Sequence, residues 1–168
     1  MSDVYVISDL HFGHKNILNY RTGFSSIEEH DTIIMDNILS TVGERDTLWM
    51  LGDCFFNEES LEYLRRISSK CLQVNLVLGN HDTDNAVRQR NIRTILNEGL
   101  VNKIGSTFKR HGAWLTHTPI HPDELRGCTN IHGHVHTATI QDSRYFNACV
   151  ENINYTPRLF TECIYEND

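Results

Sequence analysis

Carboxylate, amide and imidazole side chains end five separate apolar stretches of this 168-residue chain. These are the groups that Mn, Fe, Zn, Co and Ni ions accept as ligands when no cysteine is offered. Imidazole also carries protons near neutral pH, and the chain has ten histidines. The sequence therefore predicts metal-dependent acid–base chemistry at one shared rim. The residues at these ends are Asp9, His11, Asp53, Asn80, His81, Asp82, His117, His134 and His136.

Taken singly, each of these residues has an ordinary structural explanation. Asp9 alone is a typical loop cap, and Asp53 after a glycine is a common turn residue. His134 and His136 alternate, which places both on one face of an extended segment, as on any polar strand face. Five such ends together are hard to explain as caps, and the candidate ligands are too many for one four-coordinate structural zinc. Two ions that share a bridging carboxylate fit better.

The elements that must position these residues follow an α/β pattern in the first half. Val4 to Ile7, "DTLWMLGD" and "LQVNLVLGNHD" are typical of buried strands. "SSIEEHDTIIMDNILSTVG" and "NEESLEYLRRIS" are typical of helices, with Ser26 and Asn57 as expected N-caps. This order predicts parallel pairing. Ligands of such sheets bind beyond the carboxyl ends of the strands, where the candidate residues lie.

The second half changes to short strands with glycine turns. No linker or repeat separates the halves, so residues 1–168 are expected to form a single domain. The final segment, "TPRLFTECIYEND", fits a short helix or an edge strand equally well.

Charge and composition limit the functional classes. A net charge of -7 argues against a broad nucleic-acid surface. No stretch approaches the roughly 18 apolar residues that a membrane helix needs, and the first apolar run is short and broken by Asp9, unlike a signal peptide. The five cysteines are scattered, without a CxxC pair, which favours reduced thiols and a cytoplasmic location.

The motifs "SDLHFGH", "LGDC", "GNHD", "THTP" and "GHVH" resemble, in order and spacing, those of the calcineurin-like metallophosphoesterase superfamily. The short length and "DLHFGHKNIL" resemble the small phosphoesterases of bacteria and their viruses. The resemblance implies an α/β fold, a metallophosphoesterase-type sandwich of two mixed β-sheets flanked by helices.

The resemblance also assigns roles residue by residue. It implies two divalent metal ions per chain, with Mn favoured and Fe, Zn, Ni or Co as alternatives. The first ion would take Asp9, His11, Asp53 and His136, with Asp53 bridging to the second. The second would be completed by Asn80, His117 and His134. A metal-bridging hydroxide would attack phosphorus while His81 protonates the leaving oxygen, and Asp82 would orient the His81 imidazole.

The other histidines and the arginines carry weaker expectations. His14 and Arg21 are candidates for substrate contact, with a solvated loop position as the alternative. His132 suits the interior or a place behind the ligands. The remaining residues are expected at the surface, namely His30, His111, His121, Arg88, Arg90 and Arg93.

The sequence thus predicts a metal-dependent phosphoric ester hydrolase that acts on small phosphodiesters. A phosphomonoesterase, and a non-catalytic metal-binding scaffold of the same fold, remain as alternatives. The expected partner is a small phosphate ester. Long nucleic acid is disfavoured by the acidic composition, no membrane association is expected, and the oligomeric state is left open.

Overall fold

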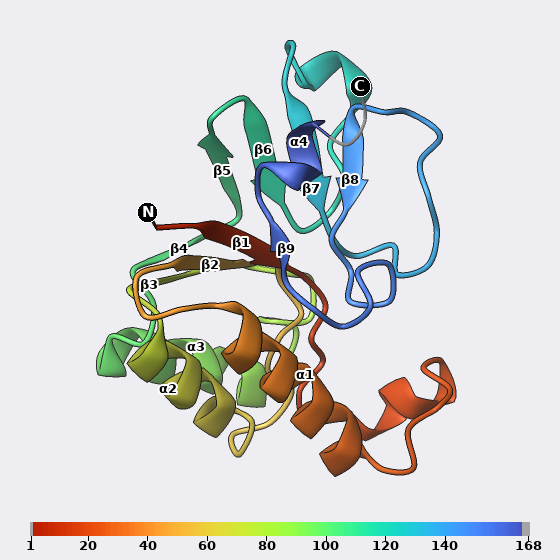
Figure 1. Cartoon of the computed structure of the whole chain (residues 1–168). Coiled ribbons are helices and arrows are strands. Elements are labelled where there is room, and N and C mark those ends of the chain that lie inside the picture. Colours follow the sequence, from red (N-terminus) through yellow and green to blue (C-terminus); the bar gives the residue numbers. More distant parts are fainter. Residues whose placement is uncertain (1, 166–168) are drawn as a thin grey trace.

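A computed structural model describes residues 2–165 and arranges their strands in two facing sheets (Figure 1). The larger sheet has the order β4-β3-β2-β1-β9. Its first four strands pair in parallel, and β9 runs antiparallel to β1 at the edge. Its members are β1 (Val4–Ile7), β2 (Thr47–Met50), β3 (Gln73–Val77), β4 (Lys103–Gly105) and β9 (Arg158–Leu159).

The smaller sheet has the order β5-β6-β7-β8 and is also mixed. β5 and β6 form an antiparallel pair, whereas β6, β7 and β8 pair in parallel. Two mixed sheets with helices outside confirm the predicted α/β sandwich. The strands are β5 (Thr107–Arg110), β6 (Ala113–Thr116), β7 (Thr129–His132) and β8 (Tyr145–Asn147).

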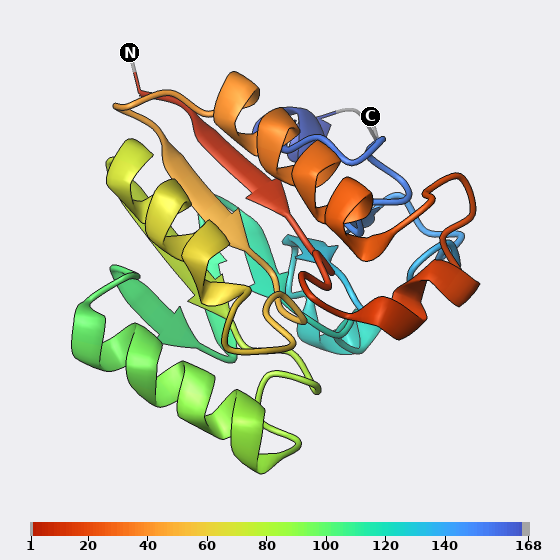
Figure 2. The ribbon, with the colours of Figure 1, turned by 90° about the horizontal axis from the view of Figure 1, so that it is seen from below.

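Three helices, α1 (Ile27–Thr41), α2 (Leu61–Lys70) and α3 (Ala86–Glu98), cover the outer face of the larger sheet (Figures 1 and 2). The expected cap of α1 is confirmed, because the Ser26 side chain accepts a hydrogen bond from the Glu29 amide. Asn57 was wrongly expected to cap α2. Its side chain accepts from the amide of Ser60, in the turn before the helix, and Ser60 is the residue that precedes α2.

Alternation along the strands divides the apolar residues between two cores. Ile7 and Met50 pack toward the helices, together with Ile34 and Leu64. Their strand neighbours, including Val6 and Trp49, instead fill the space between the two sheets. The central strands are therefore packed on both faces, which fixes the positions of the strand ends. The inter-sheet core also contains Leu51, Val77, Ala113, Leu115, Ile131, Ala148, Phe160 and Cys163.

The C-terminal segment uses both of the structures that its sequence allowed. Arg158–Leu159 forms the edge strand β9, and Glu162–Tyr165 forms the short helix α4. The last three positions of that segment, 166–168, lie outside the described residues. Over residues 2–165, no helix combines the length and apolar character needed to cross a bilayer. All five cysteines are buried.

Candidate metal centre

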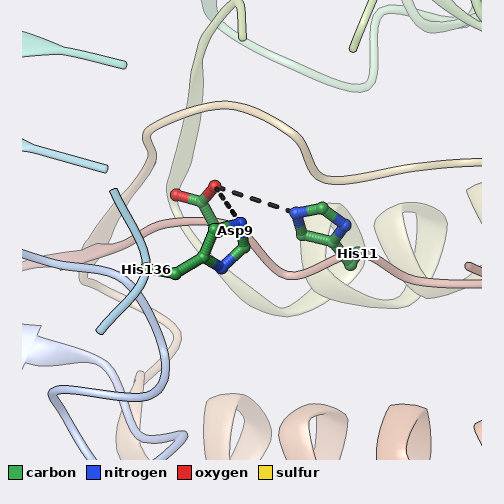
Figure 3. A group of neighbouring side chains, drawn as sticks. All are labelled: Asp9, His11 and His136. Carbon is green, nitrogen blue, oxygen red and sulfur yellow. Dashed lines mark ion pairs between the residues drawn. The ribbon is translucent and has the colours of Figure 1, made fainter. Parts of the chain in front are cut away.

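The first group of candidate ligands combines the loop after β1 with the turn after β7. Asp9 Oδ1 lies 3.7 Å from His11 Nε2 and 4.0 Å from His136 Nε2 (Figure 3). Asp9 and His11 are buried, yet neither Asp9 Oδ1 nor His11 Nε2 has a hydrogen-bond partner. Leaving buried polar atoms unpaired is costly and rare. A cation between these atoms would satisfy both, so the donor set fits a divalent ion.

The second group lies at the ends of β2, β3 and β6 and after β7. His117 Nε2 is 3.3 Å from Asp53 Oδ2 and 3.0 Å from Asn80 Oδ1. The rings of His117 and His134 lie 5.1 Å apart. Asp53 and His117 are buried, whereas Asn80 and His134 are exposed. Oxygen and imidazole donors again converge, as a second cation requires.

The Asp53 carboxylate is oriented through both of its oxygens. Oδ2 faces His117, and Oδ1 accepts a hydrogen bond of 2.8 Å from the backbone amide of His81. Burial alone would lower the pKa of His117, but the hydrogen bond with Asp53 and the nearby carboxylates raise it to about 9. A cation bound to that nitrogen replaces its proton, so acid opposes metal binding there.

The backbone is strained where these side chains are presented. Asp9, His11, Asp53, His134 and His136 all have positive φ angles, between 50° and 72°. Residues other than glycine rarely adopt this left-handed backbone conformation, and those that do cluster at functional sites. The tight turns that result aim side chains from separate strand ends toward one rim.

Two glycines allow the ligand loops to approach each other closely. A Cβ at Gly79 would collide with Asp53 Oδ1, and a Cβ at Gly133 would collide with Ser8 Oγ and Asp9 Oδ2. Both positions therefore require glycine for steric reasons. These close approaches link the third strand end to the second, and the turn that carries His134 to the first strand end.

His136 is held from behind by Glu151, which is itself held by Arg21. Glu151 Oε1 lies 2.9 Å from His136 Nδ1 and accepts a hydrogen bond of 2.8 Å from Arg21 Nε. Burial opposes ionisation of Glu151, but the hydrogen bond with His136 and the charge of Arg21 outweigh it and lower the pKa of Glu151 to about 2. A carboxylate behind a ligand imidazole fixes the orientation of the ring and raises its basicity.

Arg21 is neither a substrate contact nor a solvated residue, so both expectations for it were wrong. Only 2 % of the residue is exposed. Its guanidinium donates to the backbone oxygen of Asp9 at 2.6 Å, and also to that of Leu10. Arg21 therefore ties the loop that carries Asp9 to the carboxylate that supports His136.

His30 was wrongly expected at the surface. It is fully buried, with Nδ1 2.7 Å from Asp31 Oδ1 and Nε2 2.9 Å from Arg21 Nη1. The other oxygen of Asp31 accepts from the Gly13 amide, which joins α1 to the loop after β1. His111 and His121 are exposed as expected. The remaining histidine of the "HGHVH" region, His132, is buried and bonds the Gly133 carbonyl.

His81 stands beside the first ligand group. Its ring centroid is 6.4 Å from that of His11, and 42 % of its side chain is exposed. Its Nδ1 lies 2.8 Å from Asp84 Oδ2, which leaves Nε2 as the nitrogen available to a substrate. Arg88 contacts the other oxygen of Asp84 and lies over the Phe56 ring. Arg88 is thus largely buried and paired, unlike exposed Arg90 and Arg93.

Asp82 does not orient His81, contrary to the sequence-based expectation. Its buried carboxylate accepts hydrogen bonds from the backbone amides of Gly79, Asp53 and Cys54. Backbone amides at the ends of β2 and β3 converge on this position, so the side chain turns inward. Asp82 therefore clamps two ligand loops together, and Asp84 takes the place beside the imidazole.

His14 lines the cavity next to the first ligand group, with His11, His81, His136 and other side chains. Its ring stacks on Phe56 at a centroid distance of 4.1 Å. Burial, together with neighbouring cationic groups, lowers the pKa of His14 to about 4. At neutral pH, His14 is therefore an uncharged side chain that lines the cavity.

Comparison with known proteins gives the class of the molecule. Residues 3–151 match the calcineurin-like phosphoesterase superfamily domain, so the chain belongs to that superfamily. Members of this family typically bind divalent metals and hydrolyse phosphate esters. Each of the two Asp/His groups of this chain offers three ligand atoms within 4.8 Å of one another, which agrees with that membership.

Individual relatives are similar to this chain over different shares of its length. The Gene 66 protein of Mycobacterium phage L5 is 38% identical over 84 residues, which are 49% of this chain and 41% of the phage protein. An uncharacterised Methanocaldococcus jannaschii protein is 26% identical over 171 residues, covering 94% of this chain and 86% of that protein. The crystal structure of a protein of unknown function from Aquifex aeolicus, 27% identical, superposes with a TM-score of 0.73 over 96% of this chain and 97% of that one.

Proposed function

We propose that this protein hydrolyses small phosphodiesters with two divalent cations. The observation that carries the proposal is the pair of adjacent ligand groups, one of which holds buried atoms without hydrogen-bond partners. Asp9, His11 and His136 serve one cation, and Asn80, His117 and His134 serve the other. We assign Asp53, which groups with His117 and His134, to both cations as the bridging ligand, with Mn²⁺ as the favoured ion and Fe, Zn, Ni or Co as alternatives.

When bound, such a pair supplies Lewis-acid stabilisation of the phosphoryl oxygens and an acidified water molecule. The protein itself supplies positioning and a proton. Strained turns and the Asp82 clamp keep the ligand loops in register. A water oxygen forms the new bond to phosphorus and releases one proton to solvent, while the bond to the leaving oxygen breaks with its electron pair.

His81 is the proposed acid for that leaving oxygen. In its protonated form, Nδ1–H donates to Asp84 and Nε2–H donates to the leaving group. The Asp84 carboxylate keeps the ring oriented and stabilises its positive charge. Asp84 is itself held by Arg88, so the pair is anchored on α3.

The charge around the site favours a diester over a monoester. Within residues 2–165, no lysine or arginine lines the cavity beside His11 and His136 or the hollow beside Asn80 and His117. The first cavity also carries the carboxylate of Glu151. A phosphodiester brings one negative charge, whereas a monoester dianion brings two and would gain from a further cationic side chain.

A screen tests this function. The protein, supplied with Mn²⁺, is assayed with bis-p-nitrophenyl phosphate, p-nitrophenyl phosphate and cyclic nucleotides. We expect the diesters to be preferred by kcat/KM. Preference for p-nitrophenyl phosphate would make the protein a monoesterase. Bound metal without hydrolysis of any ester would favour the scaffold function. The free, buried thiols of Cys54, Cys71, Cys128 and Cys149 support a cytoplasmic location for the reaction.

A further inference from the structure

The two ligand groups open onto two different cavities. The cavity beside His11 and His136 measures about 390 Å³ and also contains His81, Ile17 and Tyr20. The hollow beside Asn80 and His117 measures about 340 Å³ and is lined by Ser106, Thr107, Thr116 and Thr118. The two share none of their lining residues. Both are within the size range of small-molecule sites, about 300–1,000 Å³.

The chemistry of the two cavities differs. Tyr20 and Ile17 give the first one an apolar wall, continuous with the stacked rings of His14 and Phe56. The second one is rich in hydroxyl groups, of which those of Ser106, Thr107 and Thr118 belong to exposed residues. A phosphodiester has two organic arms, so one cavity is available for each arm.

We propose that the protein selects an asymmetric phosphodiester, whose planar aromatic arm lies against Tyr20 and whose hydroxylated arm lies along Ser106, Thr107 and Thr118. This inference rests on the proposed function and adds a substrate class to it. His81, the proposed acid, lines the Tyr20 cavity and not the other. The aromatic arm is therefore the leaving arm, and the hydroxylated arm stays on the phosphate product.

The position of Tyr20 suits stacking against a planar aromatic group. It is 83 % exposed, more than any other large hydrophobic side chain among the described residues, and of those exposed side chains it is the one that lines this cavity. Its backbone is nevertheless fixed. The Tyr20 amide bonds the Ile17 carbonyl, and Ile17 and Arg21 on either side are buried. An aromatic ring on an ordered backbone loses little freedom when a planar group stacks on it.

The first test measures binding without turnover. Calorimetric titration of the Mn²⁺-loaded protein compares phenylphosphonate with methylphosphonate, neither of which has an ester bond to hydrolyse. We expect Tyr20→Ala to weaken phenylphosphonate about tenfold, within the range of ring stacking, and to leave methylphosphonate unchanged. Tyr20→Phe should keep the wild-type affinity. Leu72→Ala removes another exposed apolar side chain, far from the site in the loop after α2, and should change neither.

The second test separates the two arms. With p-nitrophenyl as the leaving arm throughout, the retained arm is either methyl or thymidine 5′-yl. We expect Tyr20→Ala to raise KM for both esters, and Thr118→Val to raise KM several-fold for the thymidine ester alone.

Equal KM values in wild type and Tyr20→Ala, with the wild type active, would overturn the aromatic subsite and leave the proposed function standing. An unchanged thymidine ester in Thr118→Val would overturn the hydroxylated subsite. A wild type that hydrolyses neither ester would instead overturn the proposed function.

Discussion

The two halves of the candidate centre are built differently. Asp9 and His11 are almost fully buried, and His136 is held by Glu151, which is held in turn by buried Arg21. In the other half, Asn80 and His134 are exposed, although Asp53 and His117 are buried. A buried, braced ligand set is preorganised, whereas exposed ligands must be ordered when the ion binds. We therefore expect the Asp9 half to bind its cation more tightly.

The largest effect is expected where the two halves meet. Asp53→Asn removes the charge of the carboxylate that we assign to both cations, so both affinities should fall and turnover should be abolished. Metal content by mass spectrometry of metals and the rate on bis-p-nitrophenyl phosphate check this. Asp36→Asn, an exposed change on α1, is the matched control. Two retained ions with a near-normal rate would show that Asp53 does not bridge.

The second-largest effect is expected for His81, the proposed acid, which is a metal ligand in neither half. His81→Ala should keep both metals, because His81 is assigned no coordination, and should lower turnover by roughly 10²–10⁴. The loss should be smaller for p-nitrophenolate than for an alkoxide leaving group, since p-nitrophenolate scarcely needs a proton. Rates on two diesters with different leaving groups measure this. Equal losses on both would remove the acid role, and lost metal would make His81 a ligand.

A third prediction separates the halves directly. Glu151→Gln should weaken the tighter class of metal sites by about 10–100-fold, as loss of a carboxylate behind a ligand imidazole does, and should leave the weaker class alone. Calorimetric Mn²⁺ titration resolves the two classes. Glu124→Gln, at an exposed carboxylate, is the control. If Glu151→Gln weakens only the weaker class, the assignment of tight and weak halves is reversed.

The smallest effect distinguishes two acidic neighbours of His81. Asp84→Asn should slow turnover a few-fold, with the leaving-group trend of His81→Ala, because the imidazole loses its orienting carboxylate. Asp82→Asn should instead lower the melting temperature, because it disturbs three buried backbone hydrogen bonds. Thermal melts and the two diester rates test both variants. A leaving-group trend in Asp82→Asn alone would restore Asp82 as the orienting residue.

The residues of the motifs were predictable because each follows an apolar strand, so pattern and chemistry coincide in the sequence. Glu151, Asp84 and buried Arg21 were missed as supporting residues. Each is a single charged residue without a local pattern, and Glu151 lies far along the chain from the arginine that it pairs with. Only the three-dimensional fold brings such partners together.

Prediction of the helices from the sequence was also incomplete. α3 was not predicted, because its sequence is rich in arginine and buries few apolar residues, with Asn91 and Ile95 as its buried positions. Its signal was the cap, where the Asn85 side chain accepts from the amides of Val87 and Arg88. Asn57 shows the opposite case, a cap signal where no cap forms. A residue suited to capping also suits the turn before a helix, so Asn57 was wrongly predicted as the N-cap of α2.

The central claim is that two cations together make this site a phosphodiesterase. The most direct measurement titrates metal-free protein with Mn²⁺ and follows heat and bis-p-nitrophenyl phosphate hydrolysis in parallel. We expect two ions per chain, the first bound more tightly, and hydrolysis that rises only as the second site fills. Full activity at one ion per chain, or two bound ions with no hydrolysis, would contradict the account.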